Sequence, residues 1–219
     1  MANEIVDFLK RIPYFGRLSA PTLADVAGRA SLRSYARREL ILLEGEPAQA
    51  VYFVVSGQVR VYKVSAGGRE QVLDRLGPGA ALNLVPVLDG APNPASATAA
   101  NAVTLCAIPR DDFLAAIRHY PPLAEAVLAD LATRLRRFAA LVEDLSFRTV
   151  RARLARLLLR QAAQPGRRFT QAEMAAELGT VRDVVGRLMA ELQDEGLVAV
   201  ERHRIIVKDR PALEAMAEV

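Results

Sequence analysis

The sequence has few of the residues that build covalent or metal-bound centres. Its 219 residues include one cysteine, Cys106, and two histidines, His119 and His203. A single cysteine permits no disulfide within the chain, and no cluster of Cys, His and carboxylate residues has metal-site spacing. No Ser/His/Asp or Cys/His pattern typical of nucleophilic catalysis is present, and Gly77 and Gly79 form only a fragment of a dinucleotide-binding motif. The sequence therefore argues against an enzyme.

Long apolar runs are also missing. No stretch approaches eighteen consecutive apolar residues, so no membrane-spanning helix is predicted. The first residues, MANEIVDFLK, mix acidic with apolar positions, unlike a secretory signal peptide. We therefore expect a cytoplasmic protein with no membrane partner. Because 52% of the residues are hydrophobic, the chain can fold into one large or two modest domains.

The most informative pattern is FTQAEMAAELGTVRDVVGRLMAELQDEGLVAVERHRIIV, which begins at Phe169. Its apolar residues recur at helical spacing in two segments that flank Gly179, and glycine readily adopts the positive φ of a turn between crossed helices. Two short strands are predicted after these helices, at 197–200 and 205–207. This layout is a helix-turn-helix followed by a β-ribbon wing, as in many DNA-binding units.

The candidate DNA contacts fall at the helix starts and in the wing. Thr170 is a good N-cap, and with Glu173 it completes a capping box. The exposed face of the second predicted helix carries arginine, which pairs with guanine O6 and N7, and an acidic residue, which accepts from cytosine N4. The net charge of only +4 agrees with a nucleic-acid partner but is weak evidence alone. The predicted DNA-binding residues are Thr170, Gln171, Thr180, Arg182, Asp183, Arg187, Arg202 and Arg204.

The segment GTVRDVVGR, Gly179 to Arg187, resembles the recognition helix of the CRP/FNR family of bacterial transcription regulators. The resemblance implies that Arg182, Asp183 and Arg187 read bases, while the wing arginines contact the backbone. Family members usually have Glu where Asp183 stands, so a water-bridged contact to cytosine is an alternative there. The resemblance also implies a homodimer on a near-palindromic site in double-stranded DNA, with RNA polymerase as a partner of an activator.

The N-terminal half has a different pattern. Residues 4 to 30 are typical of short helices, whereas 31–108 show period-two apolar spacing with glycines every ten to twelve residues, as in an antiparallel β-roll or barrel. EGEPAQAVYFVVSGQVRVYKV and IPRDDF resemble the cyclic-nucleotide-binding roll. We therefore expect an α+β fold with a sensory β-roll domain at 1–120, a dimerisation helix and hinge at 121–146, and a winged helix-turn-helix at 147–219.

A heptad seam is predicted in the helix after Pro122. Its apolar residues are spaced by 3, 4, 3, 4 and 3 positions, which is typical of coiled-coil pairing, although a helix packed on its own domain can show the same spacing. The resemblance implies that this helix forms the dimer axis. The seam residues are Leu128, Leu131, Leu135, Phe138, Val142 and Leu145.

The effector region departs from the pattern of cyclic-nucleotide-binding members. Those members hold the phosphate with a Gly-Glu pair and an Arg followed by Ser or Thr, whereas Leu82, Asn83, Asn93 and Pro94 stand here. No Lys or Arg occurs between Arg75 and Arg110. A buried phosphate would lack a cation from this loop, so we expect that the effector is a different small molecule. The predicted pocket residues are Leu82, Asn83, Asn93, Pro94, Ser96 and Arg134.

Two alternatives for the function remain. The chain lacks the cysteines for an iron–sulfur cluster, but a haem-dependent or redox-dependent gas sensor of the same family stays open. The residues support haem poorly, because His203 lies in the wing and His119 is more typical of a helix end. A regulatory binding module, like the rolls attached to kinases or channels, is the alternative from another class. It predicts a catalytic or membrane segment, which we do not find. The sequence does not distinguish activator from repressor.

Overall fold

The computed structural model describes residues 2–163, 169–201 and 204–218. They form two compact units. The first comprises Met1–Lys63 and Asp74–Arg136, and the second comprises Val64–Leu73 and Arg137–Val219.

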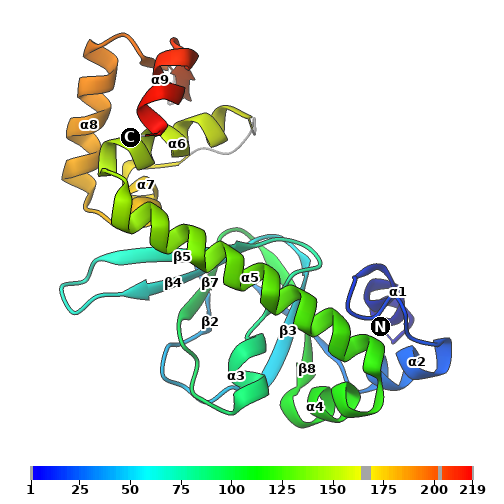
Figure 1. The fold of residues 1–219 in the computed structure, drawn as a ribbon. Coiled ribbons are helices and arrows are strands. Elements are labelled where there is room, and N and C mark those ends of the chain that lie inside the picture. Colours follow the sequence, from blue (N-terminus) through cyan, green and yellow to red (C-terminus); the bar gives the residue numbers. More distant parts are fainter. Residues whose placement is uncertain (1, 164–168, 202–203, 219) are drawn as a thin grey trace. The chain divides into compact units, whose positions relative to one another are not determined.

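The helices and strands follow one another mostly in blocks, as Figure 1 shows. The helices are α1 (Ala2–Arg11), α2 (Ala20–Gly28), α3 (Leu84–Asp89), α4 (Arg110–His119), α5 (Pro121–Phe147), α6 (Val150–Ala163), α7 (Gln171–Leu178), α8 (Arg182–Asp194) and α9 (Arg210–Ala217). The strands are β1 (Ser31–Tyr35), β2 (Leu40–Leu42), β3 (Ala50–Ser56), β4 (Val59–Val64), β5 (Glu70–Leu76), β6 (Ala81–Leu82), β7 (Ser96–Ala99), β8 (Val103–Pro109), β9 (Val198–Glu201) and β10 (Arg204–Val207). The predicted α+β fold is therefore confirmed.

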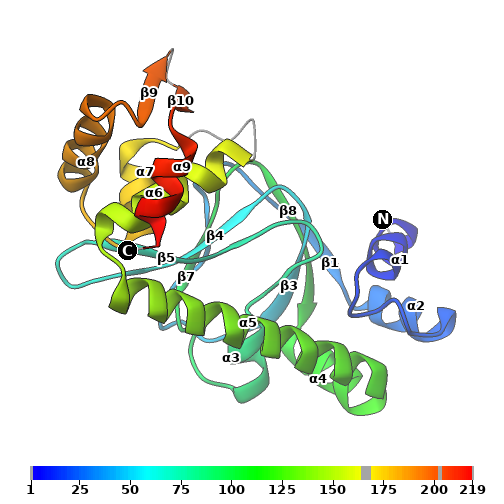
Figure 2. The ribbon, with the colours of Figure 1, turned by 45° about the horizontal axis from the view of Figure 1, so that its top comes forward.

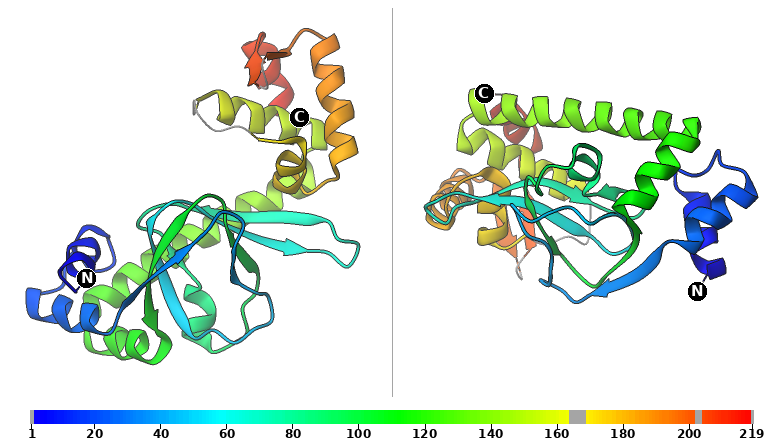
Figure 3. Two further views of the ribbon diagram at one scale, coloured as in Figure 1. Left: turned by 180° about the vertical axis from the view of Figure 1, so that it is seen from behind. Right: turned by 90° about the horizontal axis from the view of Figure 1, so that it is seen from below.

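The β-roll consists of two four-stranded sheets, with strand orders β1-β8-β3-β6 and β2-β7-β4-β5. The pairs β1–β8, β3–β8, β3–β6, β2–β7 and β4–β7 are antiparallel, and in the β3–β8 pair Phe53 lies opposite Cys106. Figure 3 shows these strands from behind and from below. The glycine-punctuated region of the sequence thus forms the predicted roll.

Strand β3 is buried on both faces. Val51 and Phe53 pack with the helices, whereas Tyr52 and Val54 pack in the interior of the roll. Alternate residues of β3 therefore face two different cores, rather than one core and the solvent. The helix-side core includes Phe15, whose ring centroid lies 5.1 Å from that of Phe53 in an edge-on contact.

The second unit has its own core, built from α6, α7, α8 and α9. Its fully buried members include Leu154, Leu158, Val185, Leu192 and Leu213. Figure 2 shows α8 and the ribbon β9–β10 in this unit.

Across the part of the chain that is described, we find no helix with the length and apolar character needed to cross a membrane.

Candidate nucleic-acid interface and effector region

The first helix of the predicted DNA reader begins with a complete capping box. The Thr170 hydroxyl accepts a hydrogen bond from the Glu173 amide at 3.2 Å, and the Thr170 amide donates to the Glu173 carboxylate at 2.8 Å. Both groups would otherwise be unpaired at a helix start. The box fixes the start of α7, so Gln171 occupies its first turn and is exposed.

The turn between α7 and α8 requires glycine. Gly179 has a φ of 64°, and its amide donates to the Ala175 carbonyl, which ends α7. The amide of Thr180 donates to the same Ala175 carbonyl at 2.9 Å, and Thr180 is half-buried. Val181 is the N-cap residue of α8, and its side chain makes no hydrogen bond to the first amides of that helix. Such amides suit an anion such as a DNA phosphate.

Helix α8 has one buried and one exposed face. Val185, Leu188, Met189 and Leu192 are buried in the core of the second unit, whereas Arg182, Asp183 and Arg187 are exposed. The Arg187 side chain is 71% exposed, and its ion pair with Glu191 at 3.9 Å is weak at such a surface. The guanidinium therefore remains available to a ligand. The structure brings the three predicted base readers onto one helix start.

The predicted wing is a two-stranded antiparallel ribbon in which Arg204 lies opposite Glu201. Glu201 also forms an ion pair with Lys208 at 3.4 Å. Arg202 and His203 lie outside the described residues, and Arg204 is placed only through its backbone in β10. The ribbon was predicted, but the backbone-contact role of the wing arginines stays a prediction.

The heptad residues of α5 divide into two groups. Leu131 packs partly against the helix-side core of the first unit. The other five are exposed, to between 39% and 71% of their surface: Leu128, Leu135, Phe138, Val142 and Leu145. This stripe is the feature expected of a helix whose partner is another chain.

The predicted effector residues do not gather at one point. Asn83 is buried with a φ of 68°, and its amide donates to the Ala50 carbonyl at 3.2 Å. Asn93 donates to the Leu43 carbonyl at 3.0 Å, and Ser96 accepts from the Glu44 amide at 3.0 Å. Leu82 is buried and Pro94 is exposed. The two asparagines therefore hold different parts of the roll.

Arg134, on α5, contacts the roll beside Leu82. It forms an ion pair with Asp130 at 2.5 Å and also donates to the Ala81 carbonyl, beside Leu82. Asp130 is not among the residues predicted from the sequence, although Asp and Arg four residues apart on a helix are a recognisable pair. Burial alone would lower the pKa of Arg134, but Asp130, and after it Tyr14, outweigh burial and raise that pKa.

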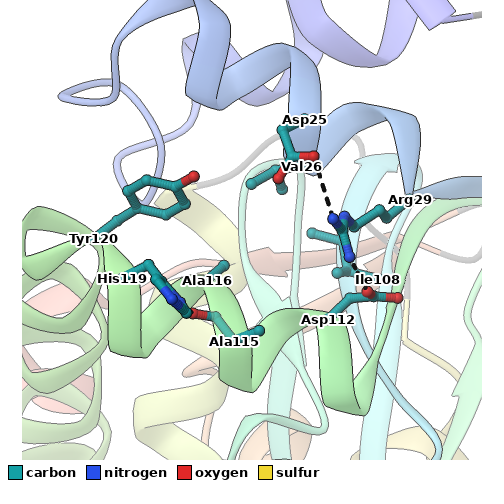
Figure 4. A pocket seen from close by; sticks show the side chains of 9 residues that line it. All are labelled: Asp25, Val26, Arg29, Ile108, Asp112, Ala115, Ala116, His119 and Tyr120. Carbon is teal, nitrogen blue, oxygen red and sulfur yellow. Dashed lines mark hydrogen bonds and ion pairs between the residues drawn. The ribbon is translucent and has the colours of Figure 1, made fainter.

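A shallow cavity of about 230 Å³ lies between α2 and α4 (Figure 4). Arg29 bridges Asp25 and Asp112 at its wall, with distances of 3.3 and 2.8 Å. His119 also lines the cavity, and its Nδ1 lies 2.8 Å from the Ala115 carbonyl, so this histidine does occupy a helix end. Within the described ranges we find no group of three or more side chains suited to a metal ion.

Cys106 is a core residue of β8. Its side chain has no exposed surface, and burial raises the pKa of its thiol to about 12. A thiol with such a pKa is a poor ligand and a poor redox sensor, because both roles require the thiolate. The single cysteine therefore gives no support to a haem-dependent or redox-dependent mechanism.

The geometry defines a class of protein: a β-roll joined through a long helix to a winged helix-turn-helix. Comparison with known families agrees. The cyclic nucleotide-binding domain family matches residues 32–120, and the Crp-like helix-turn-helix domain family matches residues 152–216. The chain belongs to the CRP/FNR family of transcription regulators and is a DNA-binding regulator, not an enzyme.

Individual relatives cover nearly the whole chain. The cyclic AMP receptor protein of Thermus thermophilus is 36% identical over 95% of this chain and 98% of its own length. A CRP-like cAMP-activated global transcriptional regulator of Mycobacterium tuberculosis is 27% identical over 96% of this chain and 99% of its own. A crystal structure from Eubacterium rectale, assigned to the same family, has a TM-score of 0.83 and 23% identity over 95% of this chain and 99% of its own, which supports the fold.

Proposed function

We propose that this protein is a homodimeric, sequence-specific transcription regulator whose roll senses a small effector and controls two DNA-binding units. The observation that carries the proposal is the exposure of Arg182, Asp183 and Arg187 on α8, opposite a buried apolar face. The first residues of such a helix reach base edges in the major groove. The proposed DNA site is near-palindromic, with guanines contacted by the two arginines.

The proposed dimer uses the exposed stripe of α5. Five large apolar side chains in one heptad seam would otherwise stay in water. In this proposal residues 1–120 sense the signal, 121–146 form the dimer helix and hinge, and 147–219 bind DNA. A DNA partner places the activity in the cytoplasm, and RNA polymerase is a further partner of an activator.

The proposed effector is not a cyclic nucleotide. Two of the relatives are named for cyclic AMP, but the segment from Gly77 to Pro109 contains Asp89 as its single charged residue. Asn93 can donate to a phosphate oxygen but cannot neutralise it, and its amide already bonds to Leu43. A buried phosphate without a cation is unfavourable.

One experiment tests the regulator itself. Purified protein is incubated with a pool of random duplex DNA, and the bound fraction is amplified and sequenced through several rounds. We expect an enriched site with two inverted half-sites whose centres lie about one helical turn apart. Recovery of random sequences alone would overturn the proposal of sequence-specific binding.

A further inference from the structure

A half-buried polar cluster joins α5 to the edge of the roll. Its centre is the ion pair between Asp130 and Arg134, whose side chains are 26% and 17% exposed. Arg134 also donates to the carbonyl of Ala81 in β6. Tyr14, which is 6% exposed, interacts with both members of the pair, and burial followed by Asp130 raises the pKa of its hydroxyl.

The pair has no net charge. Asp130 supplies one negative charge at 2.5 Å from the Nε of Arg134, and the Tyr14 hydroxyl stays protonated because its pKa is raised. The carboxylate and the carbonyl accept from two of the five guanidinium donors, and the negative charge of the carboxylate repels an anion. The cation that reaches β6 from α5 is therefore neutralised by a residue of its own helix.

The segment that follows β6 carries two asparagines, which have hydrogen-bonding groups but no positive charge and which bond to different parts of the roll. Asn83, which follows β6, is buried and donates to Ala50. Further along the same segment, the Oδ1 atom of Asn93 is buried and has no hydrogen-bond partner among the described residues. The bond from its amide nitrogen to Leu43 fixes which atom is the oxygen. An amide oxygen carries no positive charge, so neither asparagine replaces the cation that Asp130 neutralises.

We propose that Asp130 is a specificity-determining residue: by holding Arg134 in an ion pair, it keeps the effector region beside β6 neutral and selects an uncharged effector over an anion. This inference rests on the proposed function, because it assumes that the roll binds a small effector. It adds the chemical class of that effector and the residue that excludes the competing class.

The test removes the negative charge and asks whether anions gain affinity. Cyclic AMP and inorganic phosphate are the probes, titrated into the full-length protein by calorimetry. We expect weak binding to the wild type and at least about tenfold tighter binding of cyclic AMP to Asp130→Asn, because a half-buried cation is released for the phosphate. The double variant Asp130→Asn/Arg134→Gln should lose this gain. An unchanged affinity in folded Asp130→Asn, or a gain that persists in the double variant, would overturn the inference.

The matched control is Asp25→Asn. Asp25 and Arg29 are also an Asp and Arg four residues apart on a helix, but they lie at the α2–α4 cavity. Removing this carboxylate should leave the affinity for both probes unchanged. An equal gain in Asp25→Asn would show that the effect is one of overall charge, and it would overturn the role of Asp130.

A measurement on the wild type covers the case in which Asp130→Asn does not fold. The Nε–H signal of Arg134 should exchange slowly with solvent and should not move when phosphate is added. A phosphate-dependent shift of this signal would show that Arg134 is free to bind anions, contrary to the inference. Selection of an operator from random DNA tests the proposed regulator separately, so failure of one does not imply failure of the other.

Discussion

Thr170 and Glu173 exchange hydrogen bonds across the first turn of α7: the hydroxyl of Thr170 accepts from the Glu173 amide, and the Glu173 carboxylate accepts from the Thr170 amide. This exchange fixes the start of the helix that precedes the turn into α8. The order of the predicted DNA-binding surface should therefore depend in part on these two residues.

Replacing Thr170 with alanine should destabilise this helix start. Loss of an N-cap side chain typically costs about 0.5 to 2 kcal/mol. We expect faster amide hydrogen exchange in the peptide that contains residues 169–178, measured by mass spectrometry. Thr170→Ser keeps the hydroxyl and is the control. Equal protection in wild type and Thr170→Ala would contradict a stabilising role for the box.

Arg182 and Arg187 should determine sequence preference. Each change to alanine should weaken binding to the selected operator by roughly 1 to 3 kcal/mol and relax the preference at one base pair. Binding to random DNA should change less, because base contacts contribute little there. Fluorescence anisotropy with both DNAs measures the difference. Arg210→Ala, at an exposed arginine of α9, is the control. Equal losses on specific and random DNA would argue against base reading.

The wing arginines should behave differently. Arg202→Ala or Arg204→Ala should weaken binding to all sequences and reduce the slope of affinity against salt concentration, because fewer counterions are released from the backbone. Titrations at several salt concentrations provide the slopes. A loss confined to one base pair of the operator would instead assign base reading to the wing.

Local sequence patterns predicted the features that depend on neighbouring residues. The capping box at Thr170 spans four positions, and the turn at Gly179 depends on the positive φ of that one residue. The strands follow from period-two spacing. Even so, the pattern in β3 did not indicate that both faces are buried. Which layers cover a strand is decided by distant segments: Phe15 and Phe113 belong to the core on one face of β3.

The contacts of the effector region were beyond prediction because they join distant residues. Asn83 bonds to Ala50 and Asn93 bonds to Leu43, over 33 and 50 positions in the sequence. The sequence identified the asparagines as replacements for charged residues, but it gave no information about their partners. Asp130 was missed for the same reason: its importance arises from the approach of Arg134 to Ala81, 53 positions away.

Cyclic nucleotides should bind the wild-type protein poorly. Compared with a pocket that supplies an arginine, the affinity should be lower by about a hundredfold or more, since a buried charge left unpaired costs on the order of 3 to 5 kcal/mol. Asn93→Arg combined with Pro94→Ser should recover part of this affinity. Calorimetry with cyclic AMP and cyclic GMP measures it. Micromolar binding to the wild type, together with tighter operator binding, would contradict the prediction.

The seam of α5 should hold the dimer together. Leu135 and Phe138 are 71% and 46% exposed in the single chain, so burial in a partner would remove much of their apolar surface from water. Replacing both with glutamate would place two like charges in each helix of the seam, and we expect the mass measured by light scattering to fall from twice 23.8 kDa to 23.8 kDa. Val85→Glu is the matched control, because Val85 is also 46% exposed but lies on α3, outside the seam. A dimeric double variant would assign the interface to another surface, whereas monomers that also lose operator binding would show that two DNA-binding units must act together.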